Sequence, residues 1–389
     1  MALPVSYNVR SLLVRWKTSL LAMFGIGLVV TVFIVLLAMV SGFRLVLRAT
    51  GLPDNGIVTQ RGSNSELTSW LTKDNADVIS VDGRVAREKD GQPMASCEMV
   101  VITALPRQNN GQLANVTVRG VTPKAFDVRG GLNFVQGRNF TPGLDEIIVG
   151  KQIQQRVKGL DLGSKVRMQN RDWTVVGIFA ADGNSFESEI WGDYNVMGPA
   201  FMRQGGCESL TVRLTSAAVI SGFDKDLRAN PQMQVKLDPE RKYYEDQAGP
   251  VAGPLLALAG FVSIVMGIGA VFGAMNTMYA IVSARTREVG TLRALGFSRF
   301  SILSSFVLES VFLALVGGLL GCLLAIPANG FSTATGQTAS FSEIAFAFRI
   351  TSVDLLAGLV FALVMGIFGG LLPAFRAARL PITSALREA

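Results

Sequence analysis

Histidine is absent from this sequence of 389 residues, and cysteine occurs only three times. Histidine supplies the imidazole of most general acid–base sites and of hydrolytic triads, so its absence excludes both. Cys97, Cys207 and Cys322 are too far apart for the paired spacing of a structural zinc site. We therefore expect no catalytic residue and no bound metal, and predict that the chain is not an enzyme by itself.

Nucleotide-binding loops and distinctive carboxylate pairs are also missing. Residues 159–165 have the wrong glycine spacing for a Walker A loop, and Gly267-Ile-Gly269 lies inside an apolar run. We therefore expect no nucleotide cofactor to bind directly. The net charge of +7 forms no basic stripe interleaved with aromatic residues, which argues against a nucleic-acid partner. Three acidic pairs are interpreted as solvated charges of turns and helices: Asp145–Glu146, Glu187–Glu189 and Glu245–Asp246.

Long apolar runs, by contrast, dominate both ends of the chain. Hydrophobic residues make up 49% of the sequence, and the mean hydropathy is +0.39. Four runs are long enough to cross the ~30 Å hydrocarbon core of a bilayer, which takes roughly 17–25 residues. One globular core is too small to bury so much apolar surface, so we predict an integral membrane protein. The runs cover residues 18–43, 251–284, 301–326 and 353–373.

Positive charge gathers at the ends of these runs and predicts their orientation. Short loops rich in Lys and Arg stay in the cytoplasm, so both termini and residues 285–300 are predicted inside, with residues 44–250 outside. Residues 1–41 begin like a signal peptide, but their apolar run exceeds the roughly 7–15 residues of an h-region, so an uncleaved span is favoured. The basic residues are Arg10, Arg15, Lys17, Arg285, Arg287, Arg293, Arg299, Arg376, Arg379 and Arg387.

The external segment, residues 44–250, is predicted to be a mixed α/β domain. Helical composition appears at residues 67–75, 150–158 and 216–230. Cys97 and Cys207 both fall in this domain, where a disulfide and two free buried thiols remain equally open. Runs rich in β-branched residues predict strands at residues 98–103, 115–121, 146–149, 165–168 and 172–179.

Small residues and one acid stand out within the apolar runs. Three Gly-x-x-x-Gly motifs predict a tightly packed helix bundle or a dimer. Apart from Asp354 at the very start of the fourth run, Glu309 is the one carboxylate within a predicted span, and such an acid suggests function by default. Because it lies near the cytoplasmic end, a packing or salt-bridge role is favoured over ion or proton handling. The motifs are Gly269/Gly273, Gly317/Gly321 and Gly366/Gly370.

The basic segment between the second and third runs reads as a helical elbow. Arg285 and Glu288 stand at i, i+3 and can pair on one helix face. Gly296 can adopt the left-handed conformation that ends a helix, and Ser298 can then cap the next one. The segment is either a loop that merely orients the protein or a docking surface. Four residues are expected to make its apolar contacts: Ile281, Val289, Leu292 and Leu295.

Several motifs resemble the FtsX/MacB family of ABC-transporter permeases, which has the type VII fold. The resemblance is carried by Asn276-Thr-Met278, residues 285–290, Arg293–Gly296, residues 370–374, 377–381 and 385–387, with external matches at 118–121, 137–140 and 175–177. It implies four transmembrane helices with a large mixed α/β periplasmic domain between the first and second. It also implies dimers of permeases and an ABC ATPase that docks on the loop between spans two and three.

The resemblance also implies roles for particular residues. Pro373, Arg376 and Arg379 would end the last span against the coupling element. The 389 residues contain no fused ATPase domain, so ATP and Mg²⁺ are expected on a separate ATPase partner. In the family, ATPase closure moves the external domains, a mechanism called mechanotransmission. The coupling residues carried over are Arg285, Arg287, Glu288, Gly290, Arg293 and Gly296.

We therefore predict an inner-membrane permease with both termini in the cytoplasm, most consistent with efflux. Its expected partners are the ATPase, a second identical or different permease subunit, a periplasmic adaptor and an outer-membrane channel. Lipoprotein release, signalling to a cell-wall hydrolase, and a tethered periplasmic binding protein remain alternatives. The predicted segments are a lead-in (1–17), four spans (18–43, 251–284, 301–326, 353–373), the periplasmic domain (44–250), the coupling segment (285–300), a short external loop (327–352) and a tail (374–389).

Overall fold

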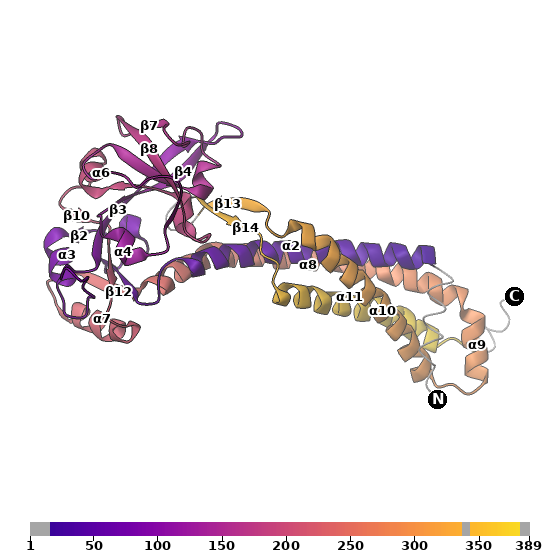
Figure 1. The fold of residues 1–389 in the computed structure, drawn as a ribbon. Coiled ribbons are helices and arrows are strands. Elements are labelled where there is room, and N and C mark those ends of the chain that lie inside the picture. The colour runs from indigo at the N-terminus through magenta and orange to yellow at the C-terminus, as the bar shows by residue number, and fades with distance from the viewer. Residues whose placement is uncertain (1–15, 337–342, 382–389) are drawn as a thin grey trace. The chain divides into compact units, whose positions relative to one another are not determined.

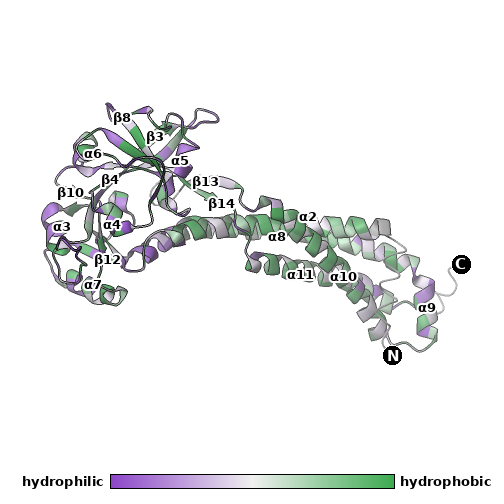
Figure 2. Cartoon of the chain, in the orientation of Figure 1, coloured by the Kyte–Doolittle hydropathy of each residue, from purple (hydrophilic) through white to green (hydrophobic). Residues whose placement is uncertain are grey.

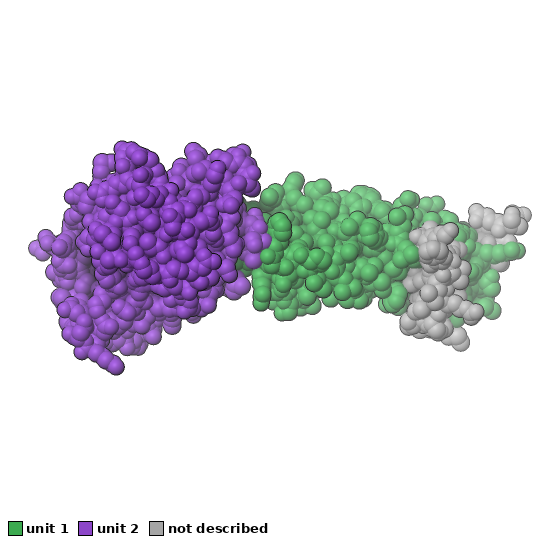
Figure 3. Space-filling model, turned by 45° about the horizontal axis from the view of Figure 1, so that its top comes forward, with its two compact units in different colours: residues 1–42, 254–331, 348–389 green, residues 43–253, 332–347 purple. Residues whose placement is uncertain are grey.

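The computed structural model describes residues 16–336 and 343–381, which fold into two compact units (Figure 3). Unit 1 comprises residues 1–42, 254–331 and 348–389, and unit 2 comprises residues 43–253 and 332–347. The lead-in expected at residues 1–17 lies outside the described residues, except for the last two, which begin the first long helix.

Long apolar helices account for the predicted spans. Within the described residues, four helices are long and apolar enough to cross a membrane. Their residues are predominantly hydrophobic along most of each helix (Figure 2). The predicted class, four transmembrane helices with a mixed α/β domain between the first two, is confirmed. The helices are α2 (Trp16–Ala49), α8 (Glu240–Ala284), α10 (Arg299–Ala325) and α11 (Ser352–Ala378).

Prolines do not mark the helix ends as the sequence suggested. Pro250 and Pro254 were expected in the first turn of the second span, but α8 begins ten residues before Pro250, at Glu240. Pro373, Arg376 and Arg379 were together expected to end the last span; α11 continues past Pro373 to Ala378, with Arg376 in its last turn and Arg379 as its C-cap. The reason is packing: buried residues lie on both sides of each proline, such as Tyr244 before Pro250, and their contacts stabilise a helix that continues through the proline. That gain outweighs the hydrogen bond that each proline removes.

Close helix packing in unit 1 uses two of the three glycine motifs. A Cβ atom at Gly321 of α10 would lie 2.6 Å from the carbonyl oxygen of Gly27 in α2. A Cβ atom at Gly370 of α11 would lie 1.9 Å from Ser310 Oγ in α10. The first glycines of these motifs, Gly317 and Gly366, are equally tight. In the third motif, no described atom of a neighbouring segment lies within 4 Å of a Cβ at Gly269 or Gly273.

Unit 2 is built on a ten-stranded sheet with the path β12-β1-β11-β3-β4-β9-β6-β8-β5, and β7 also pairs with β8. Pairing is antiparallel except between β4 and β9 and between β6 and β8. All five predicted strands are present, as β3, β4, β6, β7 and β8. Figure 1 labels β3, β4, β7 and β8 among them. The strands are β1 (Asn55–Gln60), β3 (Ala95–Pro106), β4 (Leu113–Val121), β5 (Asn133–Gly137), β6 (Glu146–Gly150), β7 (Lys165–Met168), β8 (Arg171–Ala180), β9 (Glu189–Asp193), β11 (Ser209–Arg213) and β12 (Val235–Pro239), with a separate pair of β2 (Leu71–Thr72) and β10 (Gly206–Cys207).

Short helices connect these strands. The helix predicted at 216–230 is confirmed, since η3 and α7 are continuous over 217–229. The segments predicted at 67–75 and 150–158 are only partly helical, because strand β2 interrupts the first and α5 ends at Gln154 in the second. The helices are η1 (Glu66–Thr68), α3 (Lys73–Ser80), α4 (Ala125–Arg129), α5 (Lys151–Gln154), η2 (Ser185–Ser188), α6 (Tyr194–Ala200), η3 (Ala217–Val219) and α7 (Ile220–Ala229).

The disulfide question left open by the sequence is answered. Cys97 on β3 and Cys207 on β10 are bonded, with their Cα atoms 5.6 Å apart. Cys207 lies in an apolar core with Leu71, Ile79 and Phe223. Cys322 on α10 is free. The bond closes a chain segment of 110 residues and so ties β10 to the central sheet.

The segment predicted as a short external loop, 327–352, contains structure of its own. After η4 (Ile326–Ala328), strands β13 (Ser332–Gly336) and β14 (Glu343–Ala347) form an antiparallel hairpin. The hairpin belongs to unit 2, where the Ala345 N–H donates a 3.0 Å hydrogen bond to Ser188 Oγ. Phe346 is buried, with its ring edge-on to Phe43 at 5.5 Å between centroids. Both long connections outside the membrane helices therefore contribute to unit 2.

Candidate functional site

The elbow between α8 and α10 forms as the sequence predicts. Helix α9 (Thr286–Ala294) follows α8 and is separated from α10 by a four-residue turn. Gly296 has φ of +94°, the left-handed conformation expected of it. Ser298 Oγ accepts a 3.1 Å hydrogen bond from the Ser301 N–H and so caps α10. Both helix-end predictions are confirmed.

Charge pairing joins the start of the elbow to α10. Arg285 Nε donates to Glu288 Oε2 at 3.0 Å, the predicted i, i+3 contact. Its Nη1 donates to Glu309 Oε2, also at 3.0 Å, and Glu309 is only 1% exposed. The guanidinium also lies over the Phe306 ring. Because a buried charge without a partner is costly, this pair holds the end of α8 against α10.

The outer face of the elbow mixes charged and apolar side chains. Arg287 and Glu288 are exposed, whereas Gly290 is buried. Arg293 donates to the Phe297 carbonyl and so stays at the turn. Leu295 was expected to make apolar contacts of the elbow, but it follows the last turn of α9, is 72% exposed and is not part of the apolar cluster that contains Ile281 and Val289. Phe300 is 76% exposed as well. Exposed charges beside two large apolar side chains are typical of a protein-docking surface.

A second candidate region, not predicted, is a buried ion network in unit 2. Arg119 on β4 is 1% exposed and contacts Glu66, Glu98 and Glu189 at 2.7, 2.9 and 2.7 Å. Glu189 was interpreted as a solvated charge, but it is buried, as is Glu187, which accepts the Ala181 and Gly183 N–H bonds. That interpretation is wrong because the carboxylates face the interior of the folded sheet.

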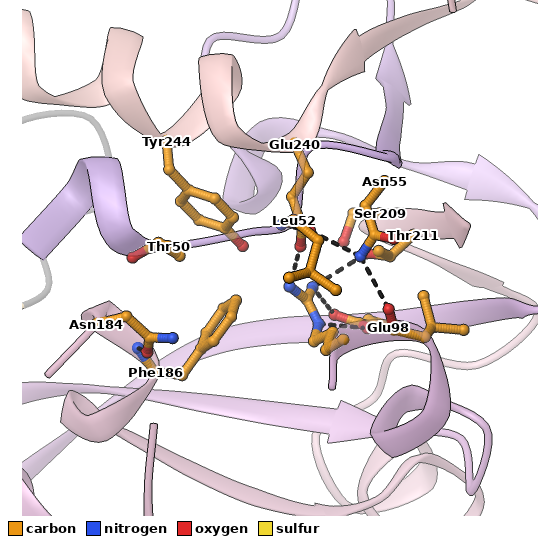
Figure 4. Close-up of polar contacts among 12 residues, drawn as sticks. Thr50, Leu52, Asn55, Glu98, Asn184, Phe186, Ser209, Thr211, Glu240 and Tyr244 are labelled. Atoms are coloured by element: carbon orange, nitrogen blue, oxygen red, sulfur yellow. Dashed lines mark hydrogen bonds and ion pairs between the residues drawn. The ribbon is translucent and has the colours of Figure 1, made fainter. Parts of the chain in front are cut away.

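Glu240, the first residue of α8, connects this network to both long helices that enter unit 2. It pairs with Arg129 of α4, which also contacts Glu98 at 2.6 Å. Its other oxygen accepts hydrogen bonds from the Leu52 N–H at 3.1 Å and Asn55 Nδ2 at 2.9 Å. Figure 4 shows these side chains converging between the start of α8 and the sheet. Leu52 and Asn55 follow α2, so one carboxylate joins the exit of α2, the start of α8 and the domain core.

Charge complementarity shifts the pKa of three members of this network, Glu66, Arg119 and Arg129. Burial alone would raise the pKa of Glu66, but the charge and hydrogen bonds of Arg119 more than offset burial and hold that pKa below its usual value. The neighbouring carboxylates likewise raise the pKa of Arg119 and Arg129 despite burial. Glu208 differs: burial raises its pKa to about 7, and this effect outweighs the hydrogen bond from the Val100 N–H and the charge of Arg203, which lies 3.4 Å away.

Comparisons with known proteins identify a related domain for each of the two units. The MacB-like periplasmic core domain matches residues 19–230, more than half of the chain, and the FtsX-like permease C-terminal domain matches residues 260–382. A macrolide export ATP-binding/permease protein MacB from Neisseria meningitidis is 25% identical over 98% of this chain and 60% of its own length. One from Photorhabdus laumondii is 28% identical over 70% of this chain and 43% of its own length.

Among solved structures, the periplasmic region of MacB from Actinobacillus actinomycetemcomitans aligns with 50% of this chain and 92% of its own, at 14% identity and a TM-score of 0.38. The chain spans about 60% of the length of the curated Neisseria relative. Both domain matches fall on the segments that the sequence motifs singled out. The chain therefore belongs to the MacB/FtsX family of ABC-transporter permeases.

Proposed function

We propose that this protein is the permease subunit of an ATP-driven exporter that works by mechanotransmission. In this mechanism an ABC ATPase holds ATP and Mg²⁺, and its closure moves the periplasmic unit through the membrane helices. The observation that carries the proposal is α8, one helix of 45 residues from Glu240 to Ala284. At ~1.5 Å per residue it is roughly 65–70 Å long, about twice the hydrocarbon thickness of a bilayer.

Buried ion pairs at both ends make α8 suited to transmitting displacement. At one end Arg285 pairs with Glu309, and at the other Glu240 pairs with Arg129. Breaking a buried ion pair costs about 3–5 kcal/mol. When α8 is displaced, the residues paired with its two ends should therefore move with it, because moving them costs less than breaking the ion pairs. The helix then acts as a lever with fixed attachments. This supports coupling between the elbow and the periplasmic unit.

The elbow is the proposed docking surface for the ATPase. Arg285, Arg287, Glu288, Gly290, Arg293 and Gly296 form the coupling element in this proposal. The exposed Leu295 and Phe300 support it, because apolar anchors beside charged residues suit a protein partner. The sequence contains no nucleotide loop of its own, which is consistent with energy arriving from an ATPase.

Export is the proposed direction because the relatives are named as macrolide export proteins. The protein would lie in the bacterial inner membrane with both ends of the chain in the cytoplasm. A second permease subunit, a periplasmic adaptor and an outer-membrane channel complete the proposed assembly. The substrate would be taken up outside the membrane rather than pass through the helix bundle.

Co-purification with the ABC ATPase encoded beside its gene tests this function. We expect the wild-type permease to form a complex with the ATPase and to alter its rate of ATP hydrolysis. With Glu288→Arg, we expect no ATP hydrolysis in the permease-bound fraction. The matched control is Asp77→Arg, an equal charge reversal at an exposed position of α3 in unit 2. If Glu288→Arg forms the same complex with the same hydrolysis as the control, the docking assignment is wrong.

A further inference from the structure

A basic pocket of about 260 Å³ lies in unit 2 beside the β13–β14 hairpin. Ser332, the first residue of β13, reaches its edge. We propose that this pocket binds a phosphate-bearing anion. None of the lining residues is acidic: besides Ser332 they are Arg107, Gln108, Asn109, Gln152, Gln155 and Arg156.

The backbone fixes the two arginines as neighbours. Arg107 follows the end of β3 and forms an antiparallel bridge with Val157. The Gln108 N–H donates to the Arg156 carbonyl, and the Lys158 N–H donates to the Pro106 carbonyl, both at 2.8 Å. The main chains that carry the two arginines are therefore held side by side before any ligand arrives, and both arginines line the pocket. Such preorganisation lowers the entropic cost of binding.

Charge in this pocket is only partly neutralised. Arg107 pairs with Glu343 of β14, yet its Nε atom is buried with no hydrogen-bond partner among the described residues. Arg156 is half-buried, and no described carboxylate lies within ion-pairing distance of it. Residues 337–342 contain no acidic side chain in the sequence. Among the described residues, Glu343 is therefore the carboxylate next to both arginines, and it forms its ion pair with Arg107.

The pKa of Arg156 also indicates that an anion would be stabilising here. Burial lowers its pKa, and the charge of Arg107 acts in the same direction against the opposing effect of Glu343. A bound anion reverses both effects, because it supplies the missing charge and the missing hydrogen-bond acceptors. Arginine forks match phosphate oxygens in two-point contacts. The pocket thus has the charge and the geometry for a phosphate group.

The remaining lining residues suggest what the phosphate carries. The carboxamides donate and accept, so they can bind hydroxyl or amine substituents next to the phosphate. The volume is slightly below the ~300–1,000 Å³ of pockets for drug-sized ligands, so a small polar substituent fits better than a large apolar molecule. Ser332 follows η4 by only three residues, at the end of a predicted span. A phospholipid headgroup and a soluble organic phosphate are the two sources of this chemistry.

Binding to the purified full-length protein in detergent tests the proposal. The probes are short-chain phosphatidylglycerol and soluble glycerol phosphate, each titrated by calorimetry. We expect binding that Arg156→Gln weakens at least tenfold and that Arg167→Gln leaves unchanged. Arg167 is the matched control because it is exposed and pairs distantly with Asp172, at 3.6 Å. Binding of phosphatidylglycerol identifies a headgroup site, and binding of glycerol phosphate alone identifies a soluble ligand.

Thermal unfolding without ligand gives an independent readout. Because no described carboxylate forms an ion pair with Arg156, Arg156→Gln should raise the unfolding midpoint of the phosphate-free protein. Arg107→Gln should lower it, because Glu343 loses its ion-pair partner. Absence of binding by both probes overturns the proposal. Equal binding by Arg156→Gln and Arg167→Gln overturns it too, as does a lowered midpoint for Arg156→Gln.

Discussion

At the scale of single residues, Glu240 stands out because its buried carboxylate holds several distant segments of the chain together by an ion pair and hydrogen bonds. Its carboxylate contacts Arg129, Leu52 and Asn55, which lie on three different segments. The role could not be read from the sequence, because the partners are about 110 to 190 residues away and the local pattern resembles an ordinary helix start. Only the folded sheet brings these groups together.

Glu240→Gln should destabilise the protein by about 3–5 kcal/mol, since Arg129 loses a buried counterion. Glu245→Gln is the control: its pair with Arg48 is largely exposed, and such pairs contribute roughly 0–1 kcal/mol. Urea unfolding of the full-length protein, followed by the fluorescence of the buried Trp173 and Trp191, measures both. Equal unfolding midpoints for the two variants would contradict the role given to Glu240.

Glu208 predicts a pH dependence of stability. Its pKa is about 7 in the folded protein against an ordinary value of 4.5. The folded state therefore binds the proton more tightly, so this contribution is fully present below about pH 4.5 and is lost as the pH rises through about 7. The loss amounts to ~3 kcal/mol at one pKa unit per 1.4 kcal/mol. Glu208→Gln should lose less stability than wild type between pH 5 and pH 8 in urea titrations. Parallel pH profiles would show that this carboxyl is not the titrating group.

At the scale of elements, local rules in the sequence predicted the helices, the strand positions and the elbow. Gly296 and Ser298 act through their own backbone, so their roles are readable from neighbouring residues. The helix boundaries were less predictable, because buried residues such as Tyr244 carry α8 past two prolines. The β13–β14 hairpin also escaped prediction, since its burial depends on contacts with unit 2 that are distant in sequence. Both the helix boundaries and the hairpin were mispredicted because they depend on packing between residues that are far apart in the sequence.

Substitution of the packing glycines should separate contacts within the chain from other roles. Gly321→Ala places a methyl group 2.6 Å from a backbone oxygen of α2, and overpacking of this kind typically costs about 1–3 kcal/mol. Gly269→Ala meets no described atom within 4 Å, so it should leave the thermal midpoint of the detergent-solubilised monomer unchanged or slightly raised. The comparison is made by differential scanning fluorimetry. A larger loss in Gly269→Ala than in Gly321→Ala contradicts the packing described for α10.

At the scale of the whole molecule, the disulfide links stability to cellular location. A closed segment of 110 residues gives a stabilisation of about 4–5 kcal/mol by the chain-entropy model. Such bonds persist in the periplasm rather than the cytoplasm. Protein denatured without reductant should therefore react with a thiol reagent at Cys322 alone, and after reduction at three cysteines. Labelling of all three without reductant would contradict a periplasmic unit 2.

Sequence motifs were sufficient to identify the family, because the elbow and the closing segment of the last span are local patterns. They could not place Arg156 beside Arg107, or Glu240 beside Arg129, since each pair depends on sheet topology. The coupling proposal depends on both kinds of information. It requires the predicted elbow at one end of α8 and the unpredicted ion network at the other.

The most direct test of that coupling is the ATP-dependent change in distance between the two periplasmic units of an assembled permease–ATPase complex. Spin labels at Asp77→Cys, in a Cys322→Ser background, report this distance by pulsed electron resonance. The account predicts that ATP changes the distance distribution in the otherwise wild-type protein. It also predicts that Glu240→Gln, in complexes that still hydrolyse ATP, shows a reduced change. An ATP-independent distance, or the same change in Glu240→Gln, would contradict the account.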